Sequence, residues 1–127
     1  MSHLLFIDDD PIIRQICKVY FSSKGYTVTV AKGGMEGLAK FKNGEYDLIV
    51  TDLMMPNCHG FEVIDQIKQM PRGNNTPIIL LSADINDPDM QAYERQAFQD
   101  DTLRKPFDMP DLEKKIVDLL DEFAARF

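Results

Sequence analysis

Residues 4–10 have the sequence Leu4-Leu5-Phe6-Ile7-Asp8-Asp9-Asp10, in which four apolar residues run directly into three aspartates. A short apolar run bounded by turn residues is typical of a buried strand in a parallel sheet. The same pattern returns at Leu48-Ile49-Val50-Thr51, which runs into Asp52. Ligands of open parallel sheets sit outside the carboxyl ends of the strands, so we expect Asp8, Asp9 and Asp52 to converge on one spot.

The convergence of three carboxylates has an electrostatic consequence. Two carboxylates about 4 Å apart repel each other by roughly 4 kcal/mol at an effective dielectric constant near 20. Either a cation offsets this repulsion or one carboxylate takes up a proton. Because carboxylate oxygens favour hard cations, we predict Mg²⁺ as the cofactor of this site.

Length and composition limit the classes of protein that the chain can represent. Its 127 residues are enough for one domain with a substantial core, and we predict a single domain over residues 1–127. The net charge of −7 argues against direct binding of nucleic acid. The apolar runs are too short to cross a membrane, so no membrane association is expected.

Targeting and redox features of the chain are few. Met1-Ser2-His3 has neither a charged segment nor a long apolar segment, so no signal peptide is expected. Cys17 and Cys58 have no metal-like or disulfide-framework spacing. They are expected to be free thiols in a reducing compartment, which predicts a cytoplasmic protein.

The chain alternates short apolar runs with helical patterns, the arrangement typical of repeated βαβ units and an α/β fold. The predicted strands are His3–Ile7, Tyr26–Val30, Asp47–Thr51, Pro77–Leu81 and Asp101–Arg104. Asp10-Pro11 and Asp87-Pro88 predict two helix starts, each a capping residue followed by proline. Gly25 and Gly44 are predicted to follow the first two helices as C′ residues.

Two helices show an apolar stripe that predicts the face turned toward the core. The first stripe consists of Ile13, Ile16, Cys17 and Tyr20, and the last of Leu112, Ile116, Leu119, Leu120 and Phe123. The last helix continues to the end of the chain, so we expect no output domain within these residues.

Two further polar residues follow predicted strands. Ser82 comes directly after Ile78-Ile79-Leu80-Leu81, and Lys105 follows the fifth strand. A hydroxyl donor, a lysine cation and a metal ion around one carboxylate form a site suited to a phosphoryl group. Asp52 is then the predicted nucleophile, and the product is an acyl phosphate.

Each of these residues also has a purely structural interpretation. The cluster Asp8–Asp10 could cap a helix, and for Asp10 this is the interpretation we prefer. A serine after a strand is usually a turn residue, and a lysine before proline is usually solvated. The argument for a site is that Asp8, Asp52, Ser82 and Lys105 all fall at strand ends.

With these residues in place, the chain resembles the receiver domain of the two-component response-regulator family. It carries Asp8-Asp9 after the first strand and Asp52-Leu53-Met54-Met55-Pro56 after the third, with Gly60 soon after. It also carries Ser82-Ala83 after the fourth strand and Lys105-Pro106-Phe107 after the fifth. The match covers essentially the whole chain.

The resemblance implies a flavodoxin-like, doubly wound α/β fold: a five-stranded parallel sheet of order 2-1-3-4-5 with five flanking helices. It implies that Asp52 accepts a phosphoryl group from a phosphohistidine of a histidine kinase or histidine phosphotransfer protein. Asp9, Asp52 and the backbone carbonyl of Met54 would hold Mg²⁺, and Asp8 would reach the ion through water. Ser82 and Lys105 would contact the phosphoryl group.

The chain departs from the family pattern at three positions. Receivers usually have an aromatic residue three positions before the lysine and a glycine seven positions before it, where this chain has Thr102 and Phe98. His59 stands where the family often has an aspartate that caps the third helix. His59 and His3 could be phosphoryl carriers, but ordinary structural roles are preferred for both.

We therefore expect a signalling switch that is not an enzyme on external substrates, although it assists its own phosphorylation and dephosphorylation. A downstream protein target would bind one of its two states. The sequence leaves open whether the protein forms a homodimer.

One alternative is a magnesium-dependent aspartyl-phosphate phosphatase or phosphotransferase. Such enzymes usually carry a second carboxylate two residues after the nucleophile, where this chain has Met54. The other alternative is an interaction module that works without phosphorylation. The intact set of acidic residues argues against it, and Thr102 in place of an aromatic residue weakly favours it.

Overall fold

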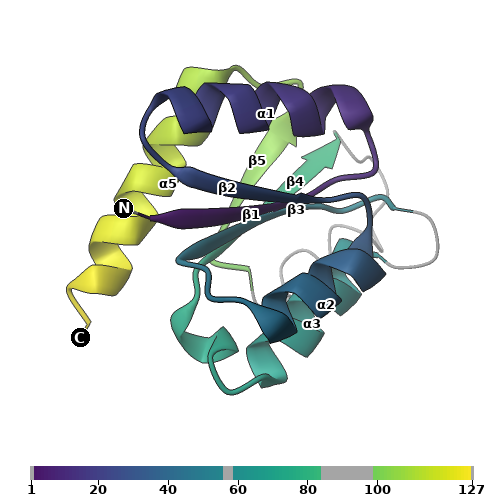
Figure 1. Ribbon diagram of the computed structural model, residues 1–127, viewed down its shortest axis with the longest axis vertical. Coiled ribbons are helices and arrows are strands. Elements are labelled where there is room, and N and C mark those ends of the chain that lie inside the picture. The colour runs from purple at the N-terminus through teal and green to yellow at the C-terminus, as the bar shows by residue number, and fades with distance from the viewer. Residues whose placement is uncertain (1, 56–58, 84–98, 127) are drawn as a thin grey trace.

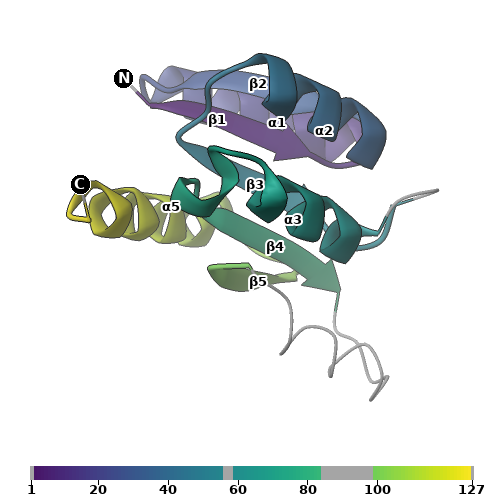
Figure 2. The ribbon, with the colours of Figure 1, turned by 90° about the horizontal axis from the view of Figure 1, so that it is seen from below.

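The computed structural model describes residues 2–55, 59–83 and 99–126. Within this part of the chain a parallel sheet of five strands has the order β2-β1-β3-β4-β5, with helices on both faces (Figure 1). This is the predicted sheet, with β5 at one edge (Figure 2). The strands are β1 (His3–Ile7), β2 (Thr27–Ala31), β3 (Leu48–Asp52), β4 (Ile78–Ala83) and β5 (Asp101–Lys105).

The described residues contain four α-helices and one short 3-10 helix. They are α1 (Pro11–Ser23), α2 (Gly34–Asn43), α3 (Gly60–Gln69), η1 (Gly73–Asn75) and α5 (Met109–Ala124). Five helices were predicted, and the predicted helix that begins at Asp87-Pro88 lies outside the described residues. Cys58 and Phe98 also lie outside them.

The predicted strands are confirmed, with boundaries that shift by one or two residues. The register explains the shifts, because Ala31 pairs with Ile7 and Asp52 pairs with Leu81. Ladder pairing thus extends β2, β3, β4 and β5 beyond the apolar runs themselves. As a result Asp52 and Lys105 are the last residues of their strands.

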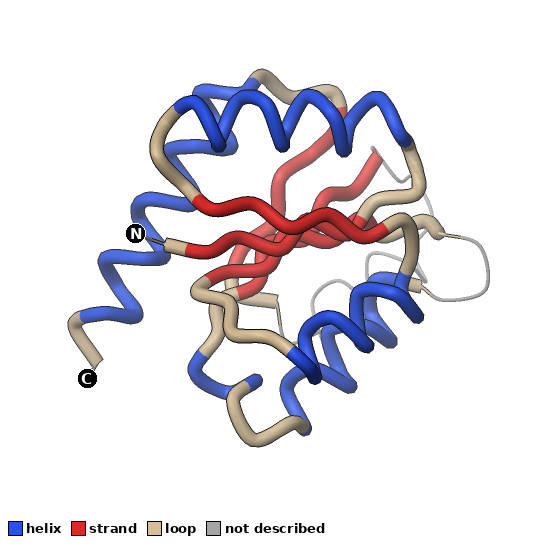
Figure 3. Tube along the Cα trace, viewed as in Figure 1, coloured by secondary structure: helices blue, strands red, loops and turns tan. Residues whose placement is uncertain are grey.

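Helices cover the sheet on both sides (Figure 3). Each side has its own core of buried side chains. On one side α2 and α3 bury side chains such as Phe41 and Ile64 against Ile7 and Leu80. On the other side α1 and α5 bury side chains such as Phe21 and Ile116 against Phe6 and Leu81. Alternation along each strand therefore sends successive residues into different cores.

The first helix begins and ends as its sequence predicts. Asp10 is the N-cap of α1 and accepts a hydrogen bond from Ile12 N at 2.9 Å, with Pro11 at the start of the helix. Gly25 follows the helix with φ 97°, a left-handed conformation that glycine adopts without steric cost. Gly44 differs from the prediction, because it is the C-cap of α2 itself and its backbone is extended.

The apolar stripes are only partly confirmed. In α5 the stripe is buried as predicted, apart from Leu120, which is half-buried. In α1 the prediction for Ile16 was wrong, since its side chain is 48% exposed while Cys17 is buried. Among the described residues, no helix combines the length and the apolar character that a membrane crossing would need.

Candidate functional site

The end of β1 holds one buried aspartate, one exposed aspartate and one capping aspartate. Asp8 is 2% exposed, whereas Asp9 lies at the surface. The backbone N–H of Asp10 donates to Asp8 Oδ1 at 2.9 Å, and the Arg14 guanidinium donates to the Asp8 carbonyl at 2.8 Å. The first bond orients the Asp8 carboxylate, and the second holds the backbone at this position. The capping role preferred for Asp10 is confirmed.

The end of β3 places Asp52 close to this group. Asp52 is 5% exposed, and the next residue continues the ladder through Leu53 N, which donates to the Leu81 carbonyl at 2.9 Å. The returning chain passes very close here, since a Cβ on Gly60 would lie 2.4 Å from the Asp52 carbonyl oxygen. Glycine at position 60 thus lets α3 begin directly beside the strand end.

The structure brings Asp8, Asp9 and Asp52 together as the sequence predicts. One carboxylate oxygen from each lies within 4.8 Å of the others. Lys105 joins them from β5, with its Nζ 3.3 Å from Asp8 Oδ2 and 3.2 Å from Asp52 Oδ1. One lysine cation therefore bridges the two buried carboxylates.

Burial and charge crowding change the proton affinities of these groups. The pKa of Asp52 is raised to about 6: burial is the largest cause, the Asp8 charge also raises the pKa, and Lys105 lowers it. Burial also raises the pKa of Asp8. For Lys105 burial lowers the pKa, but the charges of Asp8 and Asp52 outweigh this, so the net shift is upward. A single lysine thus compensates the two buried carboxylates only in part.

The raised pKa of Asp52 predicts how stability depends on pH in metal-free protein. The folded protein holds this proton more tightly than the unfolded chain, so stability falls as the pH rises from the ordinary 3.8 to about 6. The ionised carboxyl therefore costs the fold roughly 3 kcal/mol above pH 6. Asp52→Asn, which resembles the protonated form, is expected to be more stable than wild type by up to that amount at pH 8.

Denaturation in the presence of a chelator at several pH values tests this expectation. The gain from Asp52→Asn should shrink as the pH falls through 6 and vanish near 4. Asp65→Asn, at an exposed position on α3, is the matched control and should show no such dependence. Equal stability of Asp52→Asn and wild type at pH 8 would show that the buried carboxylate carries no penalty.

Ser82 lies at the end of β4, and its contact is with a residue that the sequence analysis did not single out. Ser82 is 0% exposed, and its Oγ accepts a hydrogen bond from Arg104 Nη1 at 2.8 Å. The two residues are register partners across β4 and β5. Ser82 is therefore held at the end of β4 by a guanidinium group from the neighbouring strand.

Three further residues named in the sequence analysis occupy ordinary positions in loops, caps and strands. Met54 lies two residues beyond β3, and its side chain is 53% exposed. His59 is the N-cap residue of α3 and is exposed. Thr102 is half-buried in β5, pairs with Leu80 and accepts a hydrogen bond from Gln99 Nε2 at 3.3 Å. The threonine therefore occupies the position of the missing aromatic ring as an ordinary strand residue.

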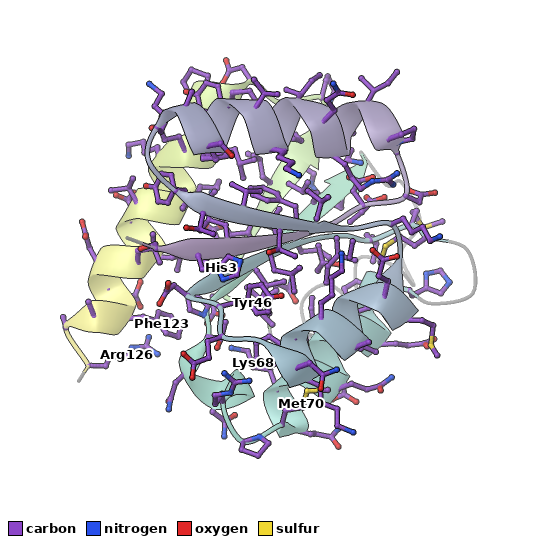
Figure 4. All side chains as sticks on the ribbon, viewed as in Figure 1. His3, Tyr46, Lys68, Met70, Phe123 and Arg126 are labelled. Atoms are coloured by element: carbon purple, nitrogen blue, oxygen red, sulfur yellow. The ribbon has the colours of Figure 1, made fainter. Side chains whose placement is uncertain are left out.

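His3 belongs to the opposite end of the sheet. It begins β1, whereas the acidic residues follow the end of that strand. Its ring lies against Tyr46, with the centroids 4.4 Å apart, and its Nε2 is 2.6 Å from Thr29 Oγ1 (Figure 4). The structural role preferred for His3 is consistent with this position.

The donor set of the acidic cluster suits a hard divalent cation. It offers carboxylate oxygens, and one of its three residues is exposed, which leaves the cluster open toward solvent. Burial, and after it the charge of Asp8, raises the pKa of Asp52, so the ionised carboxylate is disfavoured in the absence of a further cation. The residues present therefore fit Mg²⁺, which binds carboxylates and keeps several water ligands.

Comparison with known proteins finds response regulators among the relatives of this chain. A family model described as the response regulator receiver domain matches residues 4–117. The response regulator SaeR of Staphylococcus aureus is 34% identical over 120 residues, which cover 94% of this chain and 51% of that protein. The chain thus spans about half the length of the curated relatives it matches.

Solved structures of similar proteins share the fold over nearly the whole chain. The CheY-like receiver domain protein of Methanospirillum hungatei has a TM-score of 0.91 at 26% identity, covering 100% of this chain and 99% of that one. The chemotaxis protein CheY4 of Vibrio cholerae has a TM-score of 0.83 at 30% identity, with 91% and 96% coverage. The response regulator TrrA of Thermotoga maritima, solved with Mg²⁺ and BeF, has a TM-score of 0.79 at 32% identity, with 94% and 99% coverage.

Proposed function

Because the chain belongs to the response regulator receiver domain family, we propose that Asp52 accepts a phosphoryl group from a phosphohistidine of a partner protein. The observation that carries this proposal is the environment of Asp52. Its carboxylate is buried at a strand end, 3.2 Å from Lys105 Nζ and beside Asp8 and Asp9. A nucleophile, a cation and a metal-binding group therefore meet at one spot.

The proposed step moves the phosphoryl group from nitrogen to oxygen. An Asp52 carboxylate oxygen attacks the phosphorus, the P–N bond breaks, and its electron pair returns to the imidazole of the partner. Asp9 and Asp52, with the backbone carbonyl of Met54, would hold Mg²⁺, and Asp8 would reach the ion through water. When bound, the ion supplies positive charge for the phosphoryl oxygens. Lys105 provides a second positive charge from β5, and the Ser82 hydroxyl provides a hydrogen-bond donor.

A protein partner is supported by the surface next to this site. Helix α1 begins directly after Asp10, and its exposed face carries Ile12, Ile16 and Val19 with exposed fractions of 67%, 48% and 63%. An apolar pocket lined by Ile13, Ile16, Phe107 and Met109 continues from α1 to Lys105. Apolar surface beside a phosphoryl site favours docking of a histidine kinase or phosphotransfer protein over a small substrate.

The domain would therefore act as a switch and not as an enzyme on external substrates. Phosphorylation adds charge at the strand ends and biases a two-state equilibrium that a downstream protein reads. The rival phosphatase function lacks a carboxylate two residues after Asp52, where Met54 stands. We also propose that residues 1–127 form one receiver unit of a cytoplasmic pathway.

The experiment that tests the proposal is phosphoryl labelling. Incubation with acetyl phosphate and Mg²⁺ should add one phosphoryl group, which base should remove as it removes an acyl phosphate. A screen against purified, autophosphorylated histidine kinases should then show transfer to the chain. Multiple turnover of a small phosphorylated substrate by each protein molecule would support the phosphatase function instead.

Magnesium should stabilise the fold through this site. A ligand that binds only the native state adds about 2.7 kcal/mol to the free energy of unfolding at a hundred times its dissociation constant. Asp9→Ala removes the exposed member of the cluster and should weaken this effect. It should also relieve repulsion and leave the metal-free protein at least as stable as wild type.

Thermal unfolding of wild type and Asp9→Ala, each with and without millimolar Mg²⁺, measures the effect. Asp65→Ala is the control, because it removes a surface carboxylate from α3 without touching the cluster. If wild-type melting ignores millimolar Mg²⁺, the acidic cluster is not an ion site.

A further inference from the structure

Arg104 donates a hydrogen bond to Ser82 beside the acidic cluster. Arg104 Nη1 lies 2.8 Å from Ser82 Oγ, and Ser82 is completely buried. The two residues stand directly opposite each other in the parallel pairing of β4 and β5. Arg104 is also the residue immediately before Lys105, so neighbouring residues of β5 contact two different parts of the site.

The two cations approach from opposite sides of the sheet. Leu81 and Leu103 both belong to the core beneath α1 and α5, while Leu80 belongs to the core beneath α2 and α3. Strand alternation therefore puts Ser82 and Arg104 on the side of Leu80. Lys105 bridges Asp8 and Asp52, whereas Arg104 donates to Ser82, so these contacts of the two neighbouring basic residues reach different parts of the site.

The chemistry of the two groups fixes the direction of their hydrogen bond. A guanidinium has donors and no acceptor, whereas a hydroxyl has one hydrogen and two lone pairs. Arg104 therefore occupies a lone pair of Ser82 Oγ and leaves the Ser82 hydrogen free to donate elsewhere. A guanidinium bond also polarises the hydroxyl, which makes that hydrogen a stronger donor to an anion.

We propose that Arg104 is a positioning residue for the phosphoryl group on Asp52, acting through Ser82. Arg104, the Ser82 hydroxyl and a phosphoryl oxygen form a chain of hydrogen bonds with a cation at one end and an anion at the other. The chain also links the charge state of Asp52 to β5 at the edge of the sheet. The inference rests on the proposed function, because it needs a phosphoryl group on Asp52.

Binding of beryllofluoride with Mg²⁺, a phosphoryl mimic, tests this role directly. Arg104→Met keeps much of the length of the side chain and removes its donors, and it should weaken binding about tenfold, the effect of losing one charge-assisted hydrogen bond. Arg126→Met is the matched control, because Arg126 is exposed at the end of α5 and pairs with Glu122. It removes the same charge and should bind like wild type. Amide chemical shifts report the titrations.

A double-mutant cycle distinguishes action through Ser82 from a general charge effect. In a Ser82→Ala background, Arg104→Met should have no further effect on beryllofluoride binding. Arg104→Lys should recover part of the affinity, since lysine still offers a donor. In metal-free protein Arg104→Met is expected to melt below Arg126→Met, because it removes a donor from the buried Ser82 hydroxyl. Binding is therefore compared at a temperature at which both variants are folded.

The possible failures have different meanings. If wild type does not bind beryllofluoride, or Asp52→Asn binds it equally well, the proposed function fails. If wild type binds and Arg104→Met binds as well as Arg126→Met, only the role of Arg104 is wrong. Tighter binding by Arg104→Met would also overturn it, because Arg104 would then hold Ser82 away from the phosphoryl group.

Discussion

Asp52→Asn is expected to abolish stoichiometric phosphoryl labelling by acetyl phosphate and Mg²⁺. Asparagine keeps the shape of the side chain but has no carboxylate oxygen to form an acyl phosphate. Asp52 is the buried carboxylate at the end of β3, and it is the one that Lys105 and Asp8 surround. Loss of this single nucleophile should therefore remove the whole signal and not a fraction of it.

Intact-protein mass measurement before and after base treatment provides the test. Asp65→Asn, which changes an exposed carboxylate on the neighbouring helix, should label to one phosphoryl group per chain. The Asp52→Asn variant must also be shown to fold. The denaturation experiment provides this check, because the variant is expected to be more stable than wild type without metal. Full labelling of Asp52→Asn would move the acceptor to another residue and overturn the assignment.

The sheet could be predicted because its strands are buried on both faces. Such strands carry continuous apolar runs, so Leu4–Ile7 and Leu48–Val50 stand out from the helical segments around them. Their ends were less predictable, since the ladder extends to Asp52 and Lys105 through pairing with Leu81 and Ala83. Pairing depends on neighbouring strands, and a single apolar run contains no information about its neighbour.

The convergence of Asp8, Asp9, Asp52 and Lys105 could be predicted because it depends on topology alone. Each lies at or directly after the carboxyl end of a parallel strand, and those ends meet at one edge of the sheet. Their chemical roles stay predictions that the labelling and metal experiments test.

Arg104 could not have been found in this way. Its contact with Ser82 depends on the register between β4 and β5 and on the shared side of the sheet. A search for basic residues opposite polar strand ends would have included it, but only once that register was known. For Ile16 the sequence predicted a contact that the structure does not have. The helical stripe predicts one buried apolar face, but Ile16 is exposed at the pocket beside Lys105.

Lys105→Ala is expected to slow labelling of Asp52 by about a hundredfold, the usual effect of removing one group that stabilises transition-state charge. It should also affect folding, because Lys105 bridges two carboxylates with exposed fractions of 2% and 5%. The sequence alone suggested a lysine with little structural role. The bridge indicates instead a loss of roughly 1–3 kcal/mol in metal-free protein at pH 8, where both carboxylates would otherwise be ionised.

Magnesium and acid should each restore the stability that Lys105→Ala loses. Bound Mg²⁺ would replace the missing positive charge, and protonation of Asp52, whose pKa is already raised to about 6 by burial, removes the charge that needs a partner. The matched control is Lys115→Ala, because Lys115 forms a single ion pair with Asp101 at 2.9 Å and both side chains are about one-third exposed. That pair should contribute less than about 1 kcal/mol and should respond little to Mg²⁺. If both lysine variants melt alike at pH 8 without metal and label at the wild-type rate, Lys105 is only a solvated surface cation, and the charge balance proposed for this site is wrong.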